Sequence, residues 1–254
     1  MPRPLRLIHT SDIHLDPYLG TDNDHWLERR ELFRATFQRV LAATVEHEAD
    51  ILLISGDVFD SSRTRPETVA WFLEQCASIA PTPIVAINGN HDTLGDRSIY
   101  GRHDVHGVAN LHYVLEREGR TILLEDLDLV IWGRGYDESD WNFRPLEGVP
   151  ERRDDAWHVA MAHGHYERSE ADAHRSMLIH PDEIHASQWD YLALGHWEAH
   201  EDVTVGSVTA VYSGAPMPIS DANERAGLVM VVDLHPERGV SWRAENVDPR
   251  RNGG

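Results

Sequence analysis

Lysine is absent from this chain of 254 residues, so arginine supplies all 23 of its Lys and Arg positions. The formal net charge is −20. A protein that binds nucleic acid without sequence preference normally presents a basic face that displaces counterions, so this acidity argues against such binding. Three explanations of the acidity stay open: biased codon usage, solubility or salt adaptation, and carboxylates that bind divalent cations.

Cysteine and long apolar runs are also scarce. The single cysteine, Cys76, excludes an intramolecular disulfide and suits a reducing cytosol, and its apolar surroundings favour a buried thiol. No apolar run approaches the roughly 18–20 residues that a transmembrane helix needs. The N-terminal segment 1–6 has no small-residue cleavage site, so we expect no signal peptide, no membrane partner and a cytoplasmic location.

The rest of the composition is that of a globular protein. Hydrophobic residues make up 41% of the chain and charged residues 26%, and no repeat or linker divides it. We therefore expect one large domain over residues 1–247, followed by a frayed C-terminal tail at 248–254.

Apolar periodicity predicts a strand, helix, strand, helix, strand order in the first third of the chain. The strands are expected at 5–9, 51–55 and 84–88, and the helices at 26–47 and 66–79. Further on, 121–124 and 129–132 read as an antiparallel pair, 134–155 as irregular, and 157–162, 191–194, 204–205, 209–212, 228–233 and 240–245 as strands. This pattern predicts an α/β (α+β) fold, a four-layer αββα sandwich in which two mixed sheets pack together with helices outside.

Five polar motifs each follow a predicted strand. They are Asp12-Ile13-His14, Gly56-Asp57, Gly89-Asn90-His91-Asp92, Met161-Ala162-His163-Gly164 and Gly195-His196-Trp197-Glu198. Because loops converge at the carboxyl ends of parallel strands, we expect these side chains to form one site. Carboxylate, imidazole and amide oxygen are ligands that suit Mn²⁺, Fe or Zn²⁺ and not metals that require thiolates.

In this order the motifs resemble those of the calcineurin-like metallophosphoesterase superfamily, D-x-H, G-D, G-N-H-[D/E], H and G-H-x-H, over about residues 5–233. The stretches 7–15, 54–60, 191–196 and 211–216 look most like SbcD-type nuclease subunits of DNA double-strand-break repair. Nucleases of that type carry a capping region and work with an ATPase partner. This chain has no evident capping region and is very acidic, and both facts weaken the DNA-repair interpretation.

The resemblance implies a centre of two divalent metal ions, with Mn²⁺ favoured and Fe, Zn²⁺ or Mg²⁺ as alternatives. It implies that the first ion is held by Asp12, His14 and Asp57, and the second by Asp57, Asn90, His163 and His196, with Asp57 bridging. A bridging carboxylate would hold the ions about 3.5–4 Å apart, where both polarise one hydroxide and one phosphoryl oxygen.

Two further residues are assigned catalytic roles. His91 follows the ligand Asn90, so we expect it to stabilise the phosphoryl charge or protonate the leaving oxygen. Asp60 is the candidate for orienting His91 through a hydrogen bond, with Asp92 as the alternative. His165 could touch the substrate and Trp197 could stack on a nucleobase, but we favour a structural role for both.

The sequence departs from the family pattern at Glu198, where the pattern has a second histidine. We favour Glu198 as the residue that completes the shell of the first metal, which would shift the metal preference towards Mn²⁺ or Mg²⁺. Two other outcomes are open: His200 is the ligand instead of Glu198, or the first site is weakened or empty.

We therefore predict a binuclear metal-dependent phosphoesterase, most simply a phosphodiesterase that acts on a phosphate ester such as a nucleotide or nucleic acid. The alternatives are an SbcD-type DNA exonuclease subunit, a small-molecule phosphomonoesterase or cyclic-nucleotide phosphodiesterase, and a non-catalytic metal-binding module with a degenerate first site. The oligomeric state stays open.

Overall fold

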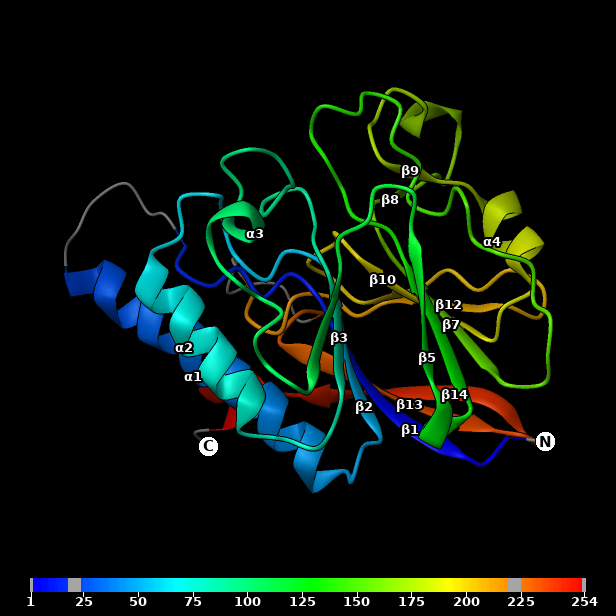
Figure 1. Ribbon diagram of the computed structural model, residues 1–254, viewed down its shortest axis with the longest axis horizontal. Coiled ribbons are helices and arrows are strands. Elements are labelled where there is room, and N and C mark those ends of the chain that lie inside the picture. The colour runs from blue at the N-terminus through cyan, green and yellow to red at the C-terminus, as the bar shows by residue number, and fades with distance from the viewer. Residues whose placement is uncertain (1, 18–23, 219–224, 253–254) are drawn as a thin grey trace.

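The computed structural model of the protein describes residues 2–17, 24–218 and 225–252. Two six-stranded sheets pack against each other at the centre of the molecule (Figure 1). The first has the order β14-β13-β1-β2-β3-β4, formed by Gly239–Asn246, Leu228–His235, Leu5–Thr10, Ile51–Ser55, Ile84–Ile87 and Leu111–Val114. Strands β1 to β4 are parallel, whereas β13 and β14 run antiparallel to their neighbours.

The second sheet is also mixed. Its order is β11-β12-β10-β7-β6-β5, formed by Glu201–Asp202, Thr209–Tyr212, Tyr191–Gly195, Trp157–His163, Leu129–Gly133 and Arg120–Leu124. Strands β12, β10, β7 and β6 are parallel, and β11 and β5 are antiparallel edges. The short strands β8 (His165–Tyr166) and β9 (Leu178–Ile179) pair separately.

Successive side chains along a strand point to opposite faces of the sheet, so the apolar core is divided into layers. On β1, Leu7 belongs to the apolar cluster between the two sheets, and its neighbour Ile8 belongs to the cluster beneath the helices. The helices α1 (Asp24–Glu46) and α2 (Pro66–Ala77) cover the outer face of the first sheet, as Figure 1 shows. The helix α4 (Pro181–Ser187) and adjoining loops cover the second sheet, while α3 (Ile99–Arg102) lies in the connection between β3 and β4. The predicted sandwich is therefore confirmed.

Most predicted strands and both long helices are present within a few residues of the expected bounds, and the strand assignments need two corrections. Residues 204–205 do not form a strand, because the antiparallel partner of β12 begins earlier, where Glu201 pairs with Tyr212. Strand β4, the edge partner of β3, was not predicted from its short sequence.

The predicted domain bounds of 1–247 and the C-terminal tail at 248–254 stay predictions, and the structure describes this segment as far as residue 252. Residues Pro249–Asn252 form a 3-10 helix. The side chain of Asp248 is 1% exposed and pairs with Arg250 at 2.9 Å and with Arg251 at 3.6 Å. These ion pairs join the start of the segment to its 3-10 helix.

Within the described residues, no helix combines the length and apolar character needed to cross a membrane. The cytoplasmic location stays a prediction.

Candidate metal centre

All five motifs lie at the carboxyl ends of β1, β2, β3, β7 and β10, the arrangement that the strand positions predicted. Backbone hydrogen bonds join the first two loops, from Asp12 N to Gly56 O at 3.0 Å and from His14 N to Asp57 O at 3.0 Å. Asp12, His14, Asp57 and His196 all have positive φ, a region that side-chain-bearing residues seldom occupy. Such strain concentrates at functional sites, where surrounding structure fixes it.

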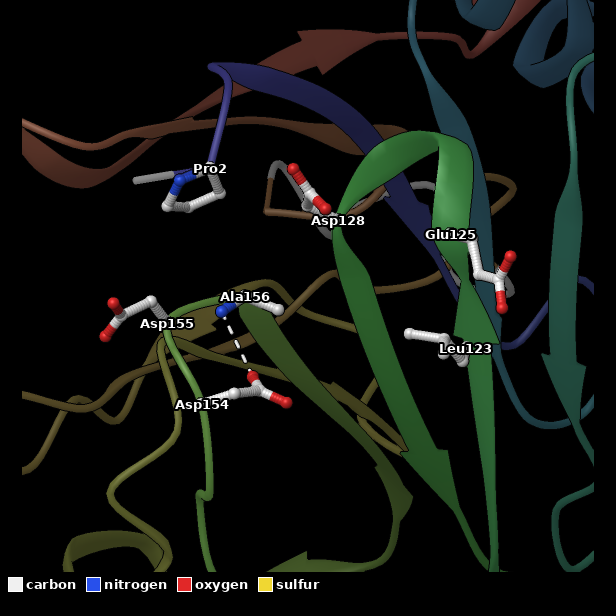
Figure 2. Close-up of a pocket in the computed structure, with 7 residues that line it drawn as sticks. All are labelled: Pro2, Leu123, Glu125, Asp128, Asp154, Asp155 and Ala156. Atoms are coloured by element: carbon white, nitrogen blue, oxygen red, sulfur yellow. Dashed lines mark hydrogen bonds between the residues drawn. The ribbon is translucent and has the colours of Figure 1, made fainter.

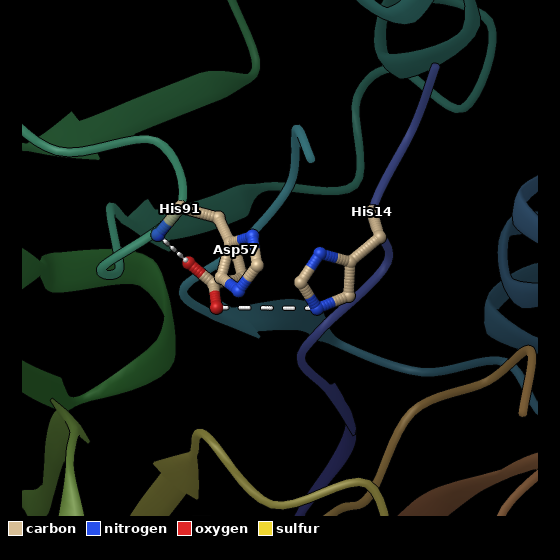
Figure 3. Close-up of side chains that lie close together, drawn as sticks. All are labelled: His14, Asp57 and His91. Carbon is tan, nitrogen blue, oxygen red and sulfur yellow. Dashed lines mark hydrogen bonds and ion pairs between the residues drawn. The ribbon is translucent and has the colours of Figure 1, made fainter. Parts of the chain in front are cut away.

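Asp57 lies at the middle of the cluster. Its Oδ2 is 3.9 Å from His14 Nε2 and 3.2 Å from His163 Nε2, and its Oδ1 accepts a 2.8 Å hydrogen bond from the backbone N–H of His91. Figure 3 shows the rings of His14 and His91 beside this carboxylate. Two groups of potential metal ligands have atoms within 4.8 Å of one another, one being His14, Asp57 and His91 and the other Asp12, Asp57 and His163. Asp57 belongs to both.

Asp12 is held through one oxygen and presents the other to the cluster. Its Oδ2 accepts hydrogen bonds from Ser11 Oγ at 2.5 Å and from the backbone N–H of His196 at 2.9 Å. Its Oδ1 lies 3.9 Å from His14 Nε2. Sequence reasoning did not identify Ser11, although it directly precedes Asp12 in the first motif.

The tautomer of His163 is set by the protein. Its Nδ1 lies 2.9 Å from the carbonyl oxygen of Ser55, which only accepts, so Nδ1 carries the proton. The other nitrogen, Nε2, faces Asn90 Oδ1 at 3.0 Å and Asp57 Oδ2 at 3.2 Å, and the same Asn90 oxygen is 2.9 Å from His196 Nδ1. Adjacent ligands of an ion with bonds near 2.1 Å lie about 3.0–3.4 Å apart. These donor atoms therefore fit a divalent cation.

Buried negative charge in the cluster raises the pKa of two of its histidines, His163 and His14. Burial lowers the pKa of His163, but the charge and hydrogen bond of Asp57 and the charge of Asp12 outweigh it and raise the pKa to about 9. The pKa of His14 is likewise raised to about 9, because the Asp60 hydrogen bond and the charges of Asp57 and Asp12 outweigh burial. The carboxylates of the cluster thus favour positive charge beside them.

Asp60 contacts both His14 and His91, in different ways. Its Oδ1 lies 3.3 Å from His14 Nδ1 and 3.9 Å from His91 Nδ1. The hydrogen bond to His91 is made by the backbone carbonyl of Asp60, at 2.9 Å from Nδ1. The predicted pairing of Asp60 with His91 is therefore present through the backbone, and the carboxylate is nearer to His14.

Asp92, the alternative partner predicted for His91, has another position. Its buried carboxylate accepts hydrogen bonds from the backbone N–H groups of Gly89 at 2.7 Å and Val58 at 3.0 Å, and from Tyr100 Oη at 2.8 Å. Asp92 thus ties the loop after β2 to the loop after β3.

Neither group of potential ligands includes Glu198 or His200. The ring of His200 is directed at the backbone, with Nδ1 2.8 Å from the carbonyl oxygen of Arg225. The backbone oxygen of Glu198 accepts a 2.8 Å hydrogen bond from Ala215. Which residue completes the first metal shell stays a prediction.

A pocket of about 400 Å³ lies at the opposite edge of the sheets (Figure 2). Its lining includes Pro2, Asp128 and Asp154, which precede β1, β6 and β7, together with Leu123, Glu125, Asp155 and Ala156. None of the predicted site residues lines this pocket, so the candidate site is the cluster at the carboxyl ends.

The chain is similar to proteins from distant organisms. It is 25% identical over 221 residues to an uncharacterized metallophosphoesterase, YhaO, of Bacillus subtilis, a match covering 83% of this chain and 52% of that protein. It is 25% identical over 250 residues to the DNA double-strand break repair protein Mre11 of Methanopyrus kandleri, covering 89% of this chain and 54% of that one. The chain therefore spans about half the length of these relatives.

The same fold occurs in the crystal structure of TT1561 of Thermus thermophilus, with a TM-score of 0.61 and 11% identity over 96% of this chain and 99% of that chain. Residues 5–238 match the family described as Calcineurin-like phosphoesterase, in agreement with the ordered motifs and the sandwich of two mixed sheets. The chain belongs to the calcineurin-like phosphoesterase family.

Proposed function

We propose that this protein hydrolyses phosphodiesters with two divalent metal ions, Mn²⁺ being the first candidate, that share Asp57. The observation that carries the proposal is the membership of Asp57 in both groups of converging ligand atoms. One oxygen of Asp57, Oδ2, lies nearest to both His14 and His163, and the side chain is 2% exposed, so water does not compete for it freely. Asp12 and His14 would hold one ion, and Asn90, His163 and His196 the other.

The metal ions would supply an activated hydroxide and would polarise the phosphoryl oxygen. Asn90 contributes a neutral oxygen to this set, so it adds no further negative charge to the two buried carboxylates. Asp60 would orient His14 through its carboxylate, since a charged partner on the far nitrogen of a ligating imidazole fixes the ring and raises its basicity.

His91 is proposed to act on the substrate. Its side chain is 45% exposed, whereas those of His14 and His163 are 8% and 1% exposed. The carbonyl oxygen of Asp60 accepts a hydrogen bond from Nδ1 of His91, so in the imidazolium form the Nε2–H would donate to the phosphoryl group or the leaving oxygen. His91 is also within ligand distance of His14 and Asp57, so metal binding is the alternative role that a variant must test.

A nuclease of the SbcD type, working with an ATPase partner, is the second candidate. It is supported by the similarity to the Mre11 protein of Methanopyrus kandleri, whose name places it in DNA double-strand break repair. The net charge of −20 favours a smaller phosphodiester instead, because an acidic surface repels a long polyanion. The absence of Glu198 from both ligand groups supports a third candidate, a metal-binding module with an incomplete first site.

The test compares hydrolysis of bis(p-nitrophenyl) phosphate, p-nitrophenyl phosphate and single-stranded DNA by the Mn²⁺-supplemented chain. Turnover of the diester should exceed that of the monoester, and Asp57→Asn should abolish nearly all of it. Asp182→Asn, an exposed position on α4, is the matched control and should retain activity. Full activity of Asp57→Asn would refute the shared ligand, and inactivity on all three substrates with metal bound would favour the binding module.

A further inference from the structure

Two residues outside the proposed ligand set connect the loops that carry His163 and His196. The indole Nε1–H of Trp197 donates a 3.1 Å hydrogen bond to Nδ1 of His165. Trp197 directly follows His196, and His165 lies two residues after His163. These loops are also joined by a 3.2 Å backbone hydrogen bond from Gly164 to Gly195.

The direction of the hydrogen bond fixes the protonation of His165. An indole nitrogen only donates, so Nδ1 of His165 carries no proton, and in the neutral ring the proton is on Nε2. That nitrogen lies 3.5 Å from Asp172 Oδ1. Because both ring nitrogens face protein partners, His165 has none directed at a metal ion or a substrate.

Trp197 is enclosed on both faces of its ring. Tyr212 stacks against it with ring centroids 4.2 Å apart and an interplanar angle of 16°, and the guanidinium of Arg168 lies 4.5 Å from its centroid. The hydroxyl of Tyr212 donates to the carbonyl oxygen of Gly164 at 2.8 Å. Stacking of a nucleobase on Trp197 would therefore first require displacement of Arg168.

From this geometry we infer that His165 and Trp197 are positioning residues that hold His196 beside Asn90 and so set the metal affinity of that half of the centre. The ring of His196 lies 6.2 Å from that of His165 and 5.2 Å from that of His163. Its backbone follows whichever position Trp197 takes, because the two residues are adjacent. The inference rests on the proposed metal function.

The test is calorimetric titration of the full chain with Mn²⁺, together with activity measured as a function of Mn²⁺ concentration. Trp197→Phe keeps an aromatic ring on Tyr212 but removes the donor, and His165→Ala removes the acceptor. Each should weaken binding of one of the two ions by up to about 10-fold, at the low end of the effect of losing a direct partner of a ligand, because neither residue bonds to His196 itself. Turnover at saturating Mn²⁺ should stay within a few fold of the wild type, because the residues act through metal occupancy.

Two variants serve as controls. His165→Asn places a side-chain oxygen near the position of Nδ1, so it should restore much of the lost affinity. Trp157→Phe removes an equivalent indole hydrogen bond, a 2.8 Å bond to the carbonyl oxygen of Arg3 at the other end of β7, and should leave Mn²⁺ binding unchanged. Thermal melting in EDTA verifies that each variant is folded before titration.

Unchanged Mn²⁺ affinity in both Trp197→Phe and His165→Ala would overturn the inference while leaving the proposed function intact. Loss of turnover that saturating Mn²⁺ does not restore would also overturn it, because it would indicate direct contact with the substrate. A wild-type chain that binds no Mn²⁺ would instead refute the proposed function itself.

Discussion

Replacing Asp60 with alanine separates two roles that one carboxylate might have. The structure places Asp60 Oδ1 3.3 Å from His14 Nδ1 and 3.9 Å from His91 Nδ1, while the hydrogen bond to His91 comes from the Asp60 backbone. Asp60→Ala keeps that carbonyl. We therefore expect the variant to weaken Mn²⁺ binding through His14 and to leave the support of His91 in place.

The expected size of the effect depends on pH. Loss of the partner behind a ligating histidine costs about 10- to 100-fold in metal affinity, or about 1.4–2.7 kcal/mol. The pKa of His14 is raised to about 9, and the Asp60 carboxylate, 3.3 Å from Nδ1, contributes most to raising it. Below that pH a proton competes with the metal in the wild type, and it competes less in Asp60→Ala. The deficit of the variant should thus be largest near pH 8.5 and shrink towards pH 7.

The assay is Mn²⁺ titration at pH 7 and pH 8.5, with kcat measured at saturating Mn²⁺. Asp60→Asn, which keeps an acceptor oxygen and loses the charge, should lie between the wild type and Asp60→Ala. Equal Mn²⁺ affinity of wild type and Asp60→Ala at pH 8.5 would refute the assignment to His14. A kcat reduced more than tenfold at saturating Mn²⁺ would show that the carboxylate acts on His91.

Two other predictions concern stability. Mn²⁺ at about 100 times its dissociation constant should stabilise the fold by about 2.7 kcal/mol per site and raise Tm by about 5–11 °C, an effect that EDTA reverses; a Tm unchanged by Mn²⁺ in differential scanning fluorimetry would contradict metal binding to the native state. Gly195→Ala would place a Cβ 1.9 Å from the carbonyl oxygen of Ser55, so it should lower the free energy of unfolding by at least about 1–3 kcal/mol. Gly107→Ala, whose Cβ would have its nearest contact at 3.4 Å, should be nearly neutral. Urea denaturation measures both, and equal stability of the two variants would show that β10 and β2 move apart at little cost.

The positions of the strands and of the five motifs could be read from the sequence because both depend on local patterns. Buried parallel strands such as β2 are continuous apolar runs, and the polar residues at their ends stand out against them. A shared carboxyl edge accounts for the grouping of Asp12 with Asp57 on the first sheet and of His163 with His196 on the second. The meeting of the two edges, where the His196 N–H bonds to Asp12, depends on how the sheets pack.

The partners of each side chain could not be read in this way, because they depend on rotamers and on contacts between distant loops. The sequence named Asp60 for His91, but not that the contact would use the backbone carbonyl. The link between Trp197 and His165 has no sequence signature, and the ion pairs that order the segment after Asp248 depend on side-chain burial. Whether Glu198 or His200 completes the first metal shell stays a prediction, because neither belongs to the converging ligand groups.

The number of bound ions and the magnetic coupling between them test the central claim most directly. Elemental analysis and electron paramagnetic resonance of the Mn²⁺-loaded chain should give two ions per chain with an exchange-coupled spectrum, as expected for ions about 3.5–4 Å apart that share a carboxylate. Asp57→Asn should lose the coupled signal. One ion per chain, or two ions with the spectrum of isolated Mn²⁺ in the wild type, would contradict a centre bridged by Asp57.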